Sequence, residues 1–337
     1  MAKVAHLFSA VLLLSMVAGT PGCGADDGGS QVEDSGNLFG DLFGDVAGPD
    51  GTEDDVALGP DGVVAPDIKN SDTANHQFLT DTDKDGIPDA YDLFPDDPTK
   101  PGKVIQNAVY GHTSDELWLM SVKTYEMDFV AFFKWPQDTD NNPHKMTDIA
   151  IDRYGVLYGV SYSGLYVVNP NTGDCYRVGT LPEPFNALTL VPKGVLDANS
   201  DVMVGISGVG GWYRLDQEGD QFVATLLGTY GEGYGSSGDA CSIEEVGTYA
   251  SVNKTGESHD FLVEVDPKTG AVIREVGPMS PLALVYGLAG WTGRAMAFDE
   301  SGKIAIIDTK TGEVTKVITD TPKKWWGAGV QTVLPEE

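Results

Sequence analysis

The chain has 337 residues, of which 51 are acidic and 21 are basic, so its formal net charge is −30 at pH 7. Phosphate backbones would repel this excess of negative charge, which argues against nucleic-acid binding. The three cysteines are too few for a disulfide-stapled mini-protein or a cysteine-type zinc site, and the 42 glycines indicate either the many turns of an all-β fold or a flexible tail.

Residues 1–22 have the features of a secretory signal. A weakly basic start is followed by an apolar run at residues 7–18. A run of roughly a dozen residues is too short to span the ~30 Å hydrocarbon core of a membrane. Small residues and then Cys23 follow. The pattern resembles a bacterial lipoprotein signal peptide, and this resemblance implies that Cys23 is acylated by fatty acids of the palmitate type and becomes the mature N-terminus.

The lipoprotein resemblance implies a location in the bacterial cell envelope, with the protein held by its lipid on the outer membrane or the cell surface. An alternative stays open. An ordinary signal peptide cleaved around residues 18–20 would leave Cys23 as a free thiol on a secreted protein.

Residues 23–80 form the next segment, in which Asp, Gly, Pro and Glu dominate and aromatic residues are few. Such a composition buries too little apolar surface to offset the entropy cost of ordering the chain. We therefore expect a disordered acidic linker.

Residues 81–92 contain the sharpest motif of the chain, with aspartates at positions one, three, five, nine and twelve and Gly86 at position six. Ca²⁺ takes six to eight oxygen ligands, and alternate carboxylates in a tight turn bring oxygens to one centre. Gly86 would supply the left-handed backbone that reverses the loop, and the Ile87 carbonyl would be the ligand at position seven. The predicted carboxylate ligands are Asp81, Asp83, Asp85, Asp89 and Asp92.

Residues 81–98, including the trailing Leu-Phe-Pro-Asp-Asp-Pro, resemble a thrombospondin type 3 repeat. The resemblance implies that the same five aspartates are calcium-site residues. The chain has only one copy and lacks the cysteines that brace animal arrays, so we expect weak binding with a Kd of about 0.1–1 mM. The alternative is an acidic, proline-stiffened linker without an ion.

Residues 103–335 are predicted to form a β-propeller. A turn that begins with Asp or Asn and ends with Gly recurs with its glycine at 173, 219, 270 and 312, at intervals of 46, 51 and 42 residues. This period matches a four-stranded propeller blade of ~40–50 residues. The region resembles bacterial β-propeller repeat proteins in its architecture, but its motifs are degenerate and imply no specific activity.

The order of the repeats predicts how the propeller closes. Inner strands are expected to begin at residues 148, 186, 239, 287 and 327, with small residues in the third column. The last of these strands has no partners after it, while the hairpin strands of residues 108–135 lack an inner strand. We therefore predict five blades, closed by pairing of the C-terminal strand with the strand at residues 108–111. Cys241 is expected in the core, and Cys175 on an outer strand is not expected to form a disulfide with it.

Asp148, Asn186 and Asp239 share the first column of the inner-strand alignment, so they are expected to ring one mouth of the channel. There they would bind a cation or a polar ligand, or act as an acid–base pair. The alternative is that they accept hydrogen bonds from backbone amides at the strand starts. The histidines of the mature chain have no metal-ligand spacing, and we expect them on the surface. Tryptophans in the propeller would either stack on sugar rings or pack in the core.

Two functional classes follow. The first is a non-enzymatic, membrane-anchored, calcium-binding protein whose propeller is a platform for an unidentified glycan or protein ligand. The second is a propeller glycan hydrolase or lyase that uses the carboxylates at the channel mouth. The sequence identifies no catalytic residue, and it predicts Ca²⁺ as the only cofactor.

Overall fold

The computed structural model describes residues 80–136, 144–319, 321 and 323–335. The chain divides into two compact units, Met1–Ser35 and Gly36–Glu337, and all described residues belong to the second. The predicted signal peptide, Cys23 and the acidic linker up to residue 79 lie outside the described residues.

The regular secondary structure of the described residues is almost entirely β-strand, and the strands form four sheets. The first sheet has the order β20 (Gly327–Gly329), β1 (Ala108–His112), β2 (Glu116–Ser121) and β3 (Met127–Phe132). A second contains β12 (Tyr234–Ile243), β13 (Gly247–Lys254), β14 (Phe261–Val265) and β15 (Val272–Pro278). A third contains β16 (Val285–Trp291), β17 (Arg294–Asp299), β18 (Ile304–Asp308) and β19 (Val314–Ile318).

The remaining sheet has eight strands in two antiparallel halves. One half is β4 (Asp148–Ile151), β5 (Leu157–Val160), β6 (Gly164–Val168) and β7 (Cys175–Thr180). The other half is β8 (Ala187–Val191), β9 (Val202–Ile206), β10 (Gly211–Glu218) and β11 (Gln221–Thr229). A single parallel pair, Thr180 with Gln221, joins the two halves. The short 3-10 helix η2 (Asp89–Tyr91) precedes all the strands.

The recurring turns have the conformation that their sequence predicts. Gly173, Gly219, Gly270 and Gly312 have φ values of 76°, 63°, 72° and 74°, a left-handed conformation that favours glycine. In the last of these turns the Asp308 carboxylate accepts hydrogen bonds from the backbone N–H groups of Lys310 and Thr311, at 2.9 and 2.8 Å. Asn169 and Asp266 open the turns that end at Gly173 and Gly270 in the same way. The turn at Gly219 differs, because Asp216 lies within the strand and its carboxylate bonds to Arg214.

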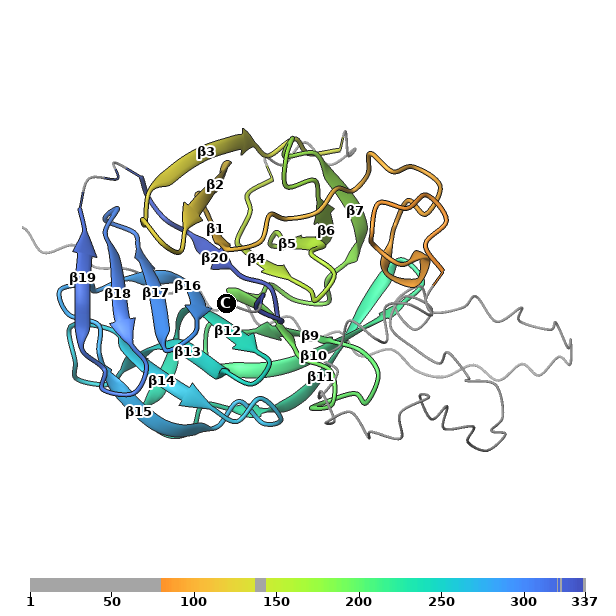
Figure 1. The fold of residues 1–337 in the computed structure, drawn as a ribbon. Coiled ribbons are helices and arrows are strands. Elements are labelled where there is room, and N and C mark those ends of the chain that lie inside the picture. Colours follow the sequence, from red (N-terminus) through yellow and green to blue (C-terminus); the bar gives the residue numbers. More distant parts are fainter. Residues whose placement is uncertain (1–79, 137–143, 320, 322, 336–337) are drawn as a thin grey trace, which may run out of the picture. The chain divides into compact units, whose positions relative to one another are not determined.

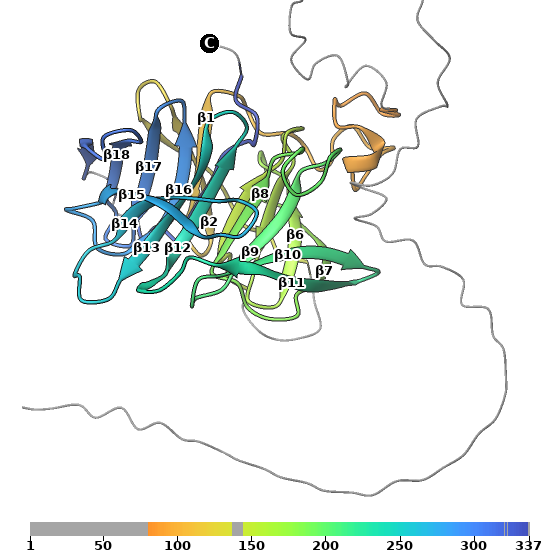
Figure 2. The same ribbon diagram turned by 90° about the horizontal axis from the view of Figure 1, so that it is seen from below.

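The innermost strands β4, β8, β12, β16 and β20 follow one another around a common axis, and β20 contacts β4 to complete the ring. Figure 1 looks along this axis, and Figure 2 shows β16, β17 and β18 running roughly parallel to it. Every residue of β4, β8 and β20 is buried, whereas the outer strands β3, β15 and β19 are largely exposed. This arrangement of antiparallel meanders around one axis is a β-propeller.

The C-terminal strand closes the propeller as predicted. Tyr110, Gly111 and His112 of β1 pair with Gly329, Ala328 and Gly327 of β20, respectively. Trp325, just before β20, is fully buried, and its ring lies 5.5 Å from that of Phe298 and 6.2 Å from that of Trp118. The first and last strands of the propeller, which are far apart in the sequence, therefore share one sheet.

The axis of the propeller is filled by side chains. Between the inner strands the cavity has a volume of about 10 Å³ and a mainly apolar lining, which is about the space of one water molecule. Cys241 is buried in this lining, Cys175 is buried on β7, and both thiols are free. The prediction of a core Cys241 is confirmed, and Cys175 lies on the outer strand β7, as expected.

In the part of the chain that the structure describes, no helix has the length and apolar character needed to cross a membrane.

Candidate functional site

The acidic loop at residues 81–92 winds through two left-handed residues, Lys84 and Gly86, with φ values of 67° and 87°. The aspartates themselves hold these turns. Asp81 accepts hydrogen bonds from the backbone N–H groups of Lys84 and Gly86 at 2.7 and 3.0 Å, and Asp85 accepts one from Ile87 at 2.7 Å. Alternate aspartates therefore face the inside of the turn.

Carboxylate oxygens of Asp81, Asp83 and Asp85 lie within 4.8 Å of one another. Among the described residues, the buried Oδ2 atoms of Asp83, Asp85 and Asp92 have no hydrogen-bond partner. Burial raises the pKa of Asp85, and it raises that of Asp92 to about 7, with the charges of nearby aspartates adding to both effects. A cation among these oxygens would offset both the desolvation and the repulsion.

The other predicted ligands are placed differently. Both carboxylate oxygens of Asp89 accept hydrogen bonds from Thr82, one from its N–H and one from its hydroxyl, each at 2.7 Å. Both Asp89 oxygens are therefore already hydrogen-bonded, and Asp89 is not part of the group formed by Asp81, Asp83 and Asp85. Asp92 is only 4% exposed and lies close enough to Asp85 and Asp83 to feel their charges.

The loop packs onto the propeller. The Ile87 side chain is fully buried in a hydrophobic cluster that includes Val156 and Tyr158. The rings of Tyr91 and Tyr154 lie 4.2 Å apart. Lys103 Nζ donates a hydrogen bond to the Gly86 carbonyl at 2.9 Å. The sequence motif gives no sign of this packing, since it depends on side chains of the propeller that are more than 60 residues away in the sequence.

At the other candidate site, Asp148 and Asp239 are completely buried and accept hydrogen bonds from backbone amides. Asp148 accepts from Ile149 N at 2.9 Å and from Leu188 N at 2.7 Å. Asp239 accepts from three amides, Ala240 N at 2.5 Å, Leu288 N at 2.5 Å and Ala328 N at 3.2 Å. These bonds connect neighbouring inner strands, as the backbone-amide alternative expects.

The carboxyl groups of Asp148 and Asp239 lie close enough to each other to influence each other's pKa. Burial raises the pKa of both groups well above its usual range, and the neighbouring charge of Asp239 raises that of Asp148 further. Two buried carboxyl groups in contact are stable only when they share a proton.

His112 lies beside this pair, with its Nε2 atom 3.7 Å from Asp148 Oδ1. Its Nδ1 atom is 2.8 Å from the Thr113 carbonyl, and burial lowers the pKa of the imidazole to about 4. The expectation of a surface histidine is wrong at this position, because His112 ends a strand that the ring of sheets buries on both sides. A Cβ atom at Gly327 would collide with both His112 and Asp148, so the close approach of β20 requires glycine here.

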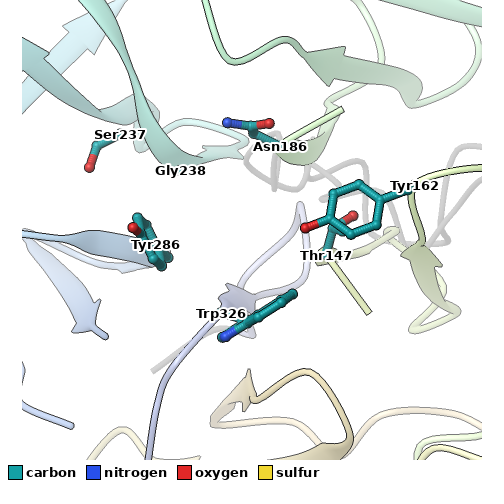
Figure 3. A pocket seen from close by; sticks show the side chains of 7 residues that line it. All are labelled: Thr147, Tyr162, Asn186, Ser237, Gly238, Tyr286 and Trp326. Carbon is teal, nitrogen blue, oxygen red and sulfur yellow. The ribbon is translucent and has the colours of Figure 1, made fainter. Parts of the chain in front are cut away.

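A pocket of about 320 Å³ opens above the buried pair, and Figure 3 shows the side chains that line it. The lining residues are Thr147, Tyr162, Asn186, Ser237, Gly238, Tyr286 and Trp326. Of the three residues expected to ring the mouth, only Asn186 lines this pocket. Asp148 and Asp239 directly follow Thr147 and Gly238, but both are fully buried and neither lines the pocket.

The aromatic lining of the pocket was not identified from the sequence. Trp326 has a detectable signal, because it neighbours Trp325 just before an inner strand, and adjacent strand residues face opposite ways. Trp325 therefore fills the core and Trp326 lines the pocket. Tyr162 and Tyr286 carry no comparable pattern, since only the ring of sheets brings them together.

No protein-family model and no curated protein matches the chain. Solved structures do match, at low similarity. A protein of unknown function from Bacteroides caccae shares 8% identity over 64% of this chain and 74% of its own, with a TM-score of 0.35. The Dos1 propeller shares 14% identity over 69% of this chain and 67% of its own, with a TM-score of 0.35. An oligogalacturonate lyase in complex with manganese shares 11% identity over 63% of this chain and 62% of its own, with a TM-score of 0.33. The propeller architecture rests on the strand order and the inner ring of this chain itself.

Proposed function

We propose that this protein is a calcium-binding protein of the bacterial cell envelope, anchored by lipid on Cys23, whose propeller is a non-enzymatic platform for binding a ligand. The observation that carries the proposal is the convergence of carboxylates in the acidic loop. Buried carboxylate oxygens that lack a hydrogen-bond donor are costly unless a cation accompanies them.

The calcium site in this proposal is built from the loop at residues 81–92. Asp81, Asp83, Asp85 and Asp92 would supply charged oxygens, and the Ile87 carbonyl would supply a neutral one. Position nine of such loops often binds through water, which suits Asp89, since Thr82 already holds both of its oxygens. Bound calcium would join the start of the loop to its end and neutralise the repulsion between them.

Calorimetric titration of the full-length protein with Ca²⁺ tests this site. We expect wild-type protein to bind with a Kd of about 0.1–1 mM, and Asp85→Asn to weaken binding at least about tenfold, or 1.4 kcal/mol. Asp96→Asn is the matched control, because Asp96 is an exposed aspartate just past the loop. Equal calcium heats for Asp85→Asn and wild type would mean that the acidic chain binds calcium only diffusely.

For the platform we propose five blades, counting the eight-stranded sheet as two. The single pair Thr180–Gln221 between its halves supports this count, because each half has its own complete antiparallel ladder. The lipid anchor rests on the sequence alone. It is tested by detergent partitioning, in which Cys23→Ala should move from the detergent phase to the aqueous phase; equal partitioning would favour a plain secretory signal.

A further inference from the structure

The pocket at the mouth of the propeller presents three aromatic side chains to one space. Tyr162 precedes β6, Tyr286 lies on β16, and Trp326 precedes β20. Figure 3 shows Tyr162, Tyr286 and Trp326 spread around the pocket, with Asn186 and Ser237 across from Trp326. Within the described residues these three rings make no ring–ring contact with one another, and Tyr162 is 56% exposed. The ring of Tyr162 is therefore open to a ligand, whereas Lys145 Nζ lies 5.4 Å from the centroid of the Trp326 ring, so a ligand at Trp326 would also meet this ammonium group.

The polar groups of the pocket are neutral and are arranged to meet hydroxyl groups. The Asn186 side-chain amide has no partner within the described part of the chain, so it offers both donors and an acceptor. Thr147 Oγ1 lies 3.1 Å from the Val160 carbonyl, and Ser237 Oγ lies 2.5 Å from Asp260 Oδ2. Both hydroxyls therefore donate into the protein and keep lone pairs for a ligand.

The floor of the pocket is rigid. Thr147 and Gly238 directly precede Asp148 and Asp239, whose carboxyl groups bind the amides of Leu188, Leu288 and Ala328 on three neighbouring inner strands. A site fixed in this way loses little conformational entropy when a ligand binds.

We propose that this pocket binds an uncharged saccharide, an assignment that rests on the proposed role of the propeller as a platform. Sugar rings have apolar C–H faces that pack on aromatic rings, and hydroxyl groups that suit the amide and hydroxyls described above. None of the seven lining side chains is charged, and the net charge of −30 opposes an anionic ligand. The pocket volume of about 320 Å³ lies near the lower end of the ~300–1,000 Å³ range of small-molecule sites. This size suits one or two sugar units.

Calorimetric titration of the full-length protein with a small panel of probes tests the proposal. The panel contains the methyl glycosides of glucose, galactose, mannose and N-acetylglucosamine, with choline and trigalacturonate as charged comparators. We expect at least one neutral glycoside to bind with a Kd of about 1 mM, and Tyr162→Ala to weaken this binding about tenfold, the equivalent of 1.4 kcal/mol. Phe132→Ala is the matched control, because Phe132 is a similarly exposed aromatic residue, at 59%, on the outer strand β3. It should bind as the wild type does.

Three results would overturn the proposal: no binding by any neutral glycoside, binding that Tyr162→Ala leaves unchanged, or a clear preference for choline, which would indicate a cation–π site. Asn186→Ala provides a second variant at an exposed position and should weaken binding of the same glycoside. Calcium titration of the same samples separates the two proposals. Normal calcium binding without saccharide binding would refute the saccharide site and leave the calcium site standing.

Discussion

In the acidic loop, the buried Oδ2 atoms of Asp83, Asp85 and Asp92 have no hydrogen-bond donor among the described residues, whereas Asp148 and Asp239 bind backbone amides through all four of their carboxylate oxygens. The loop aspartates are close together in the sequence, whereas Asp148 and Asp239 are brought together by the fold. The difference lies in how far the protein backbone satisfies them, since it reaches every oxygen of the propeller pair but leaves one buried oxygen each of Asp83, Asp85 and Asp92 without a donor.

The comparison shows that carboxylate oxygens without hydrogen-bond donors indicate a bound ligand better than the charge of the cluster does. A satisfied pair such as Asp148 and Asp239 stabilises the fold, and a set of converging, unsatisfied carboxylates favours a cation. A lone orphan oxygen is not enough. Asp152 Oδ2 also lacks a partner in the described structure, and burial raises the pKa of Asp152 to about 8, but Asp152 does not belong to a described group of three converging carboxylates.

The largest loss of stability is expected from removing β20, whose Ala328 amide donates a hydrogen bond to Asp239. Deletion of residues 325–337 would remove Trp325 from the core and the Ala328 amide from Asp239. Because loss of one buried tryptophan side chain alone costs ~3–5 kcal/mol, the truncated domain should lose its cooperative thermal transition. Removal of only the last two residues is the control. A truncated protein that melts within about 2 °C of the full-length chain would show that β20 does not close the ring.

The next largest loss of stability is expected from removing the Asp239 carboxylate, which accepts hydrogen bonds from three backbone amides. Asp239→Ala should destabilise the propeller by ~3–5 kcal/mol in chemical denaturation, because it leaves buried N–H groups without acceptors. Asp148→Ala, with two amide partners, should cost less. Calcium binding by the folded fraction should stay normal in both variants. If either variant abolished calcium binding while the protein stayed folded, the two acidic clusters would not be independent.

His112 predicts how stability depends on pH near the propeller pair. Its pKa is about 4 in the folded protein, against about 6.5 for an unfolded histidine. The unfolded chain therefore takes up the proton first as the pH falls, and the contribution of neutral His112, present above pH 6.5, is lost between pH 6.5 and 4. The raised pKa values of Asp148 and Asp239 change the stability with pH in the opposite direction. Both aspartates are present in the wild type and in His112→Asn, so their effect cancels in the difference between these two proteins.

Denaturation of wild type and His112→Asn from pH 7 to pH 4 isolates this contribution. The stability advantage of the wild type should shrink by ~3 kcal/mol over that range. A constant difference between the two proteins would mean that His112 stays accessible to protons in the folded state.

Much of the fold follows from local sequence. The glycine-terminated turns and the small residues of the inner strands are local features, and the structure places β4 at Asp148–Ile151 and β20 at Gly327–Gly329, where the alignment predicts them. The pairing of β20 with β1 also follows from the sequence, because the last predicted strand has no partners after it and the strands of residues 108–135 have no inner strand of their own.

The sites are less predictable, because they depend on which tertiary contacts cover each polar side chain. Whether Asp148 faces a channel or an amide depends on β8, 40 residues away, which supplies Leu188 N. The contact of Ile87 and Tyr91 with the propeller depends on Tyr154 and its neighbours. Neither relation leaves a periodic pattern in the sequence.

The smallest expected effect on stability is that of replacing Asp92 in the acidic loop. Asp92→Asn keeps an acceptor for the Phe94 N–H group, which now bonds to Asp92 at 2.8 Å, and above the Asp92 pKa of about 7 it removes a buried negative charge. In calcium-free buffer the variant should therefore be slightly more stable than the wild type, by ~1 kcal/mol. It should gain nothing from added calcium. A variant less stable than the wild type without calcium would show that the Asp92 charge is already compensated.

The most direct test of the central claim is the melting temperature of the full-length protein with and without 10 mM Ca²⁺. A Kd of ~0.1–1 mM gives a stabilisation of ~1.4–2.7 kcal/mol at this concentration, or about 3–10 °C for a domain of this size. Because Ile87 and Tyr91 belong to the propeller core, we predict that this shift occurs in the main transition of the propeller. In Asp85→Asn, with binding weakened about tenfold, the stabilisation should fall by ~1 kcal/mol, and in Asp96→Asn it should stay unchanged. An unchanged wild-type melting temperature, or an equal shift in Asp85→Asn, would contradict the calcium site.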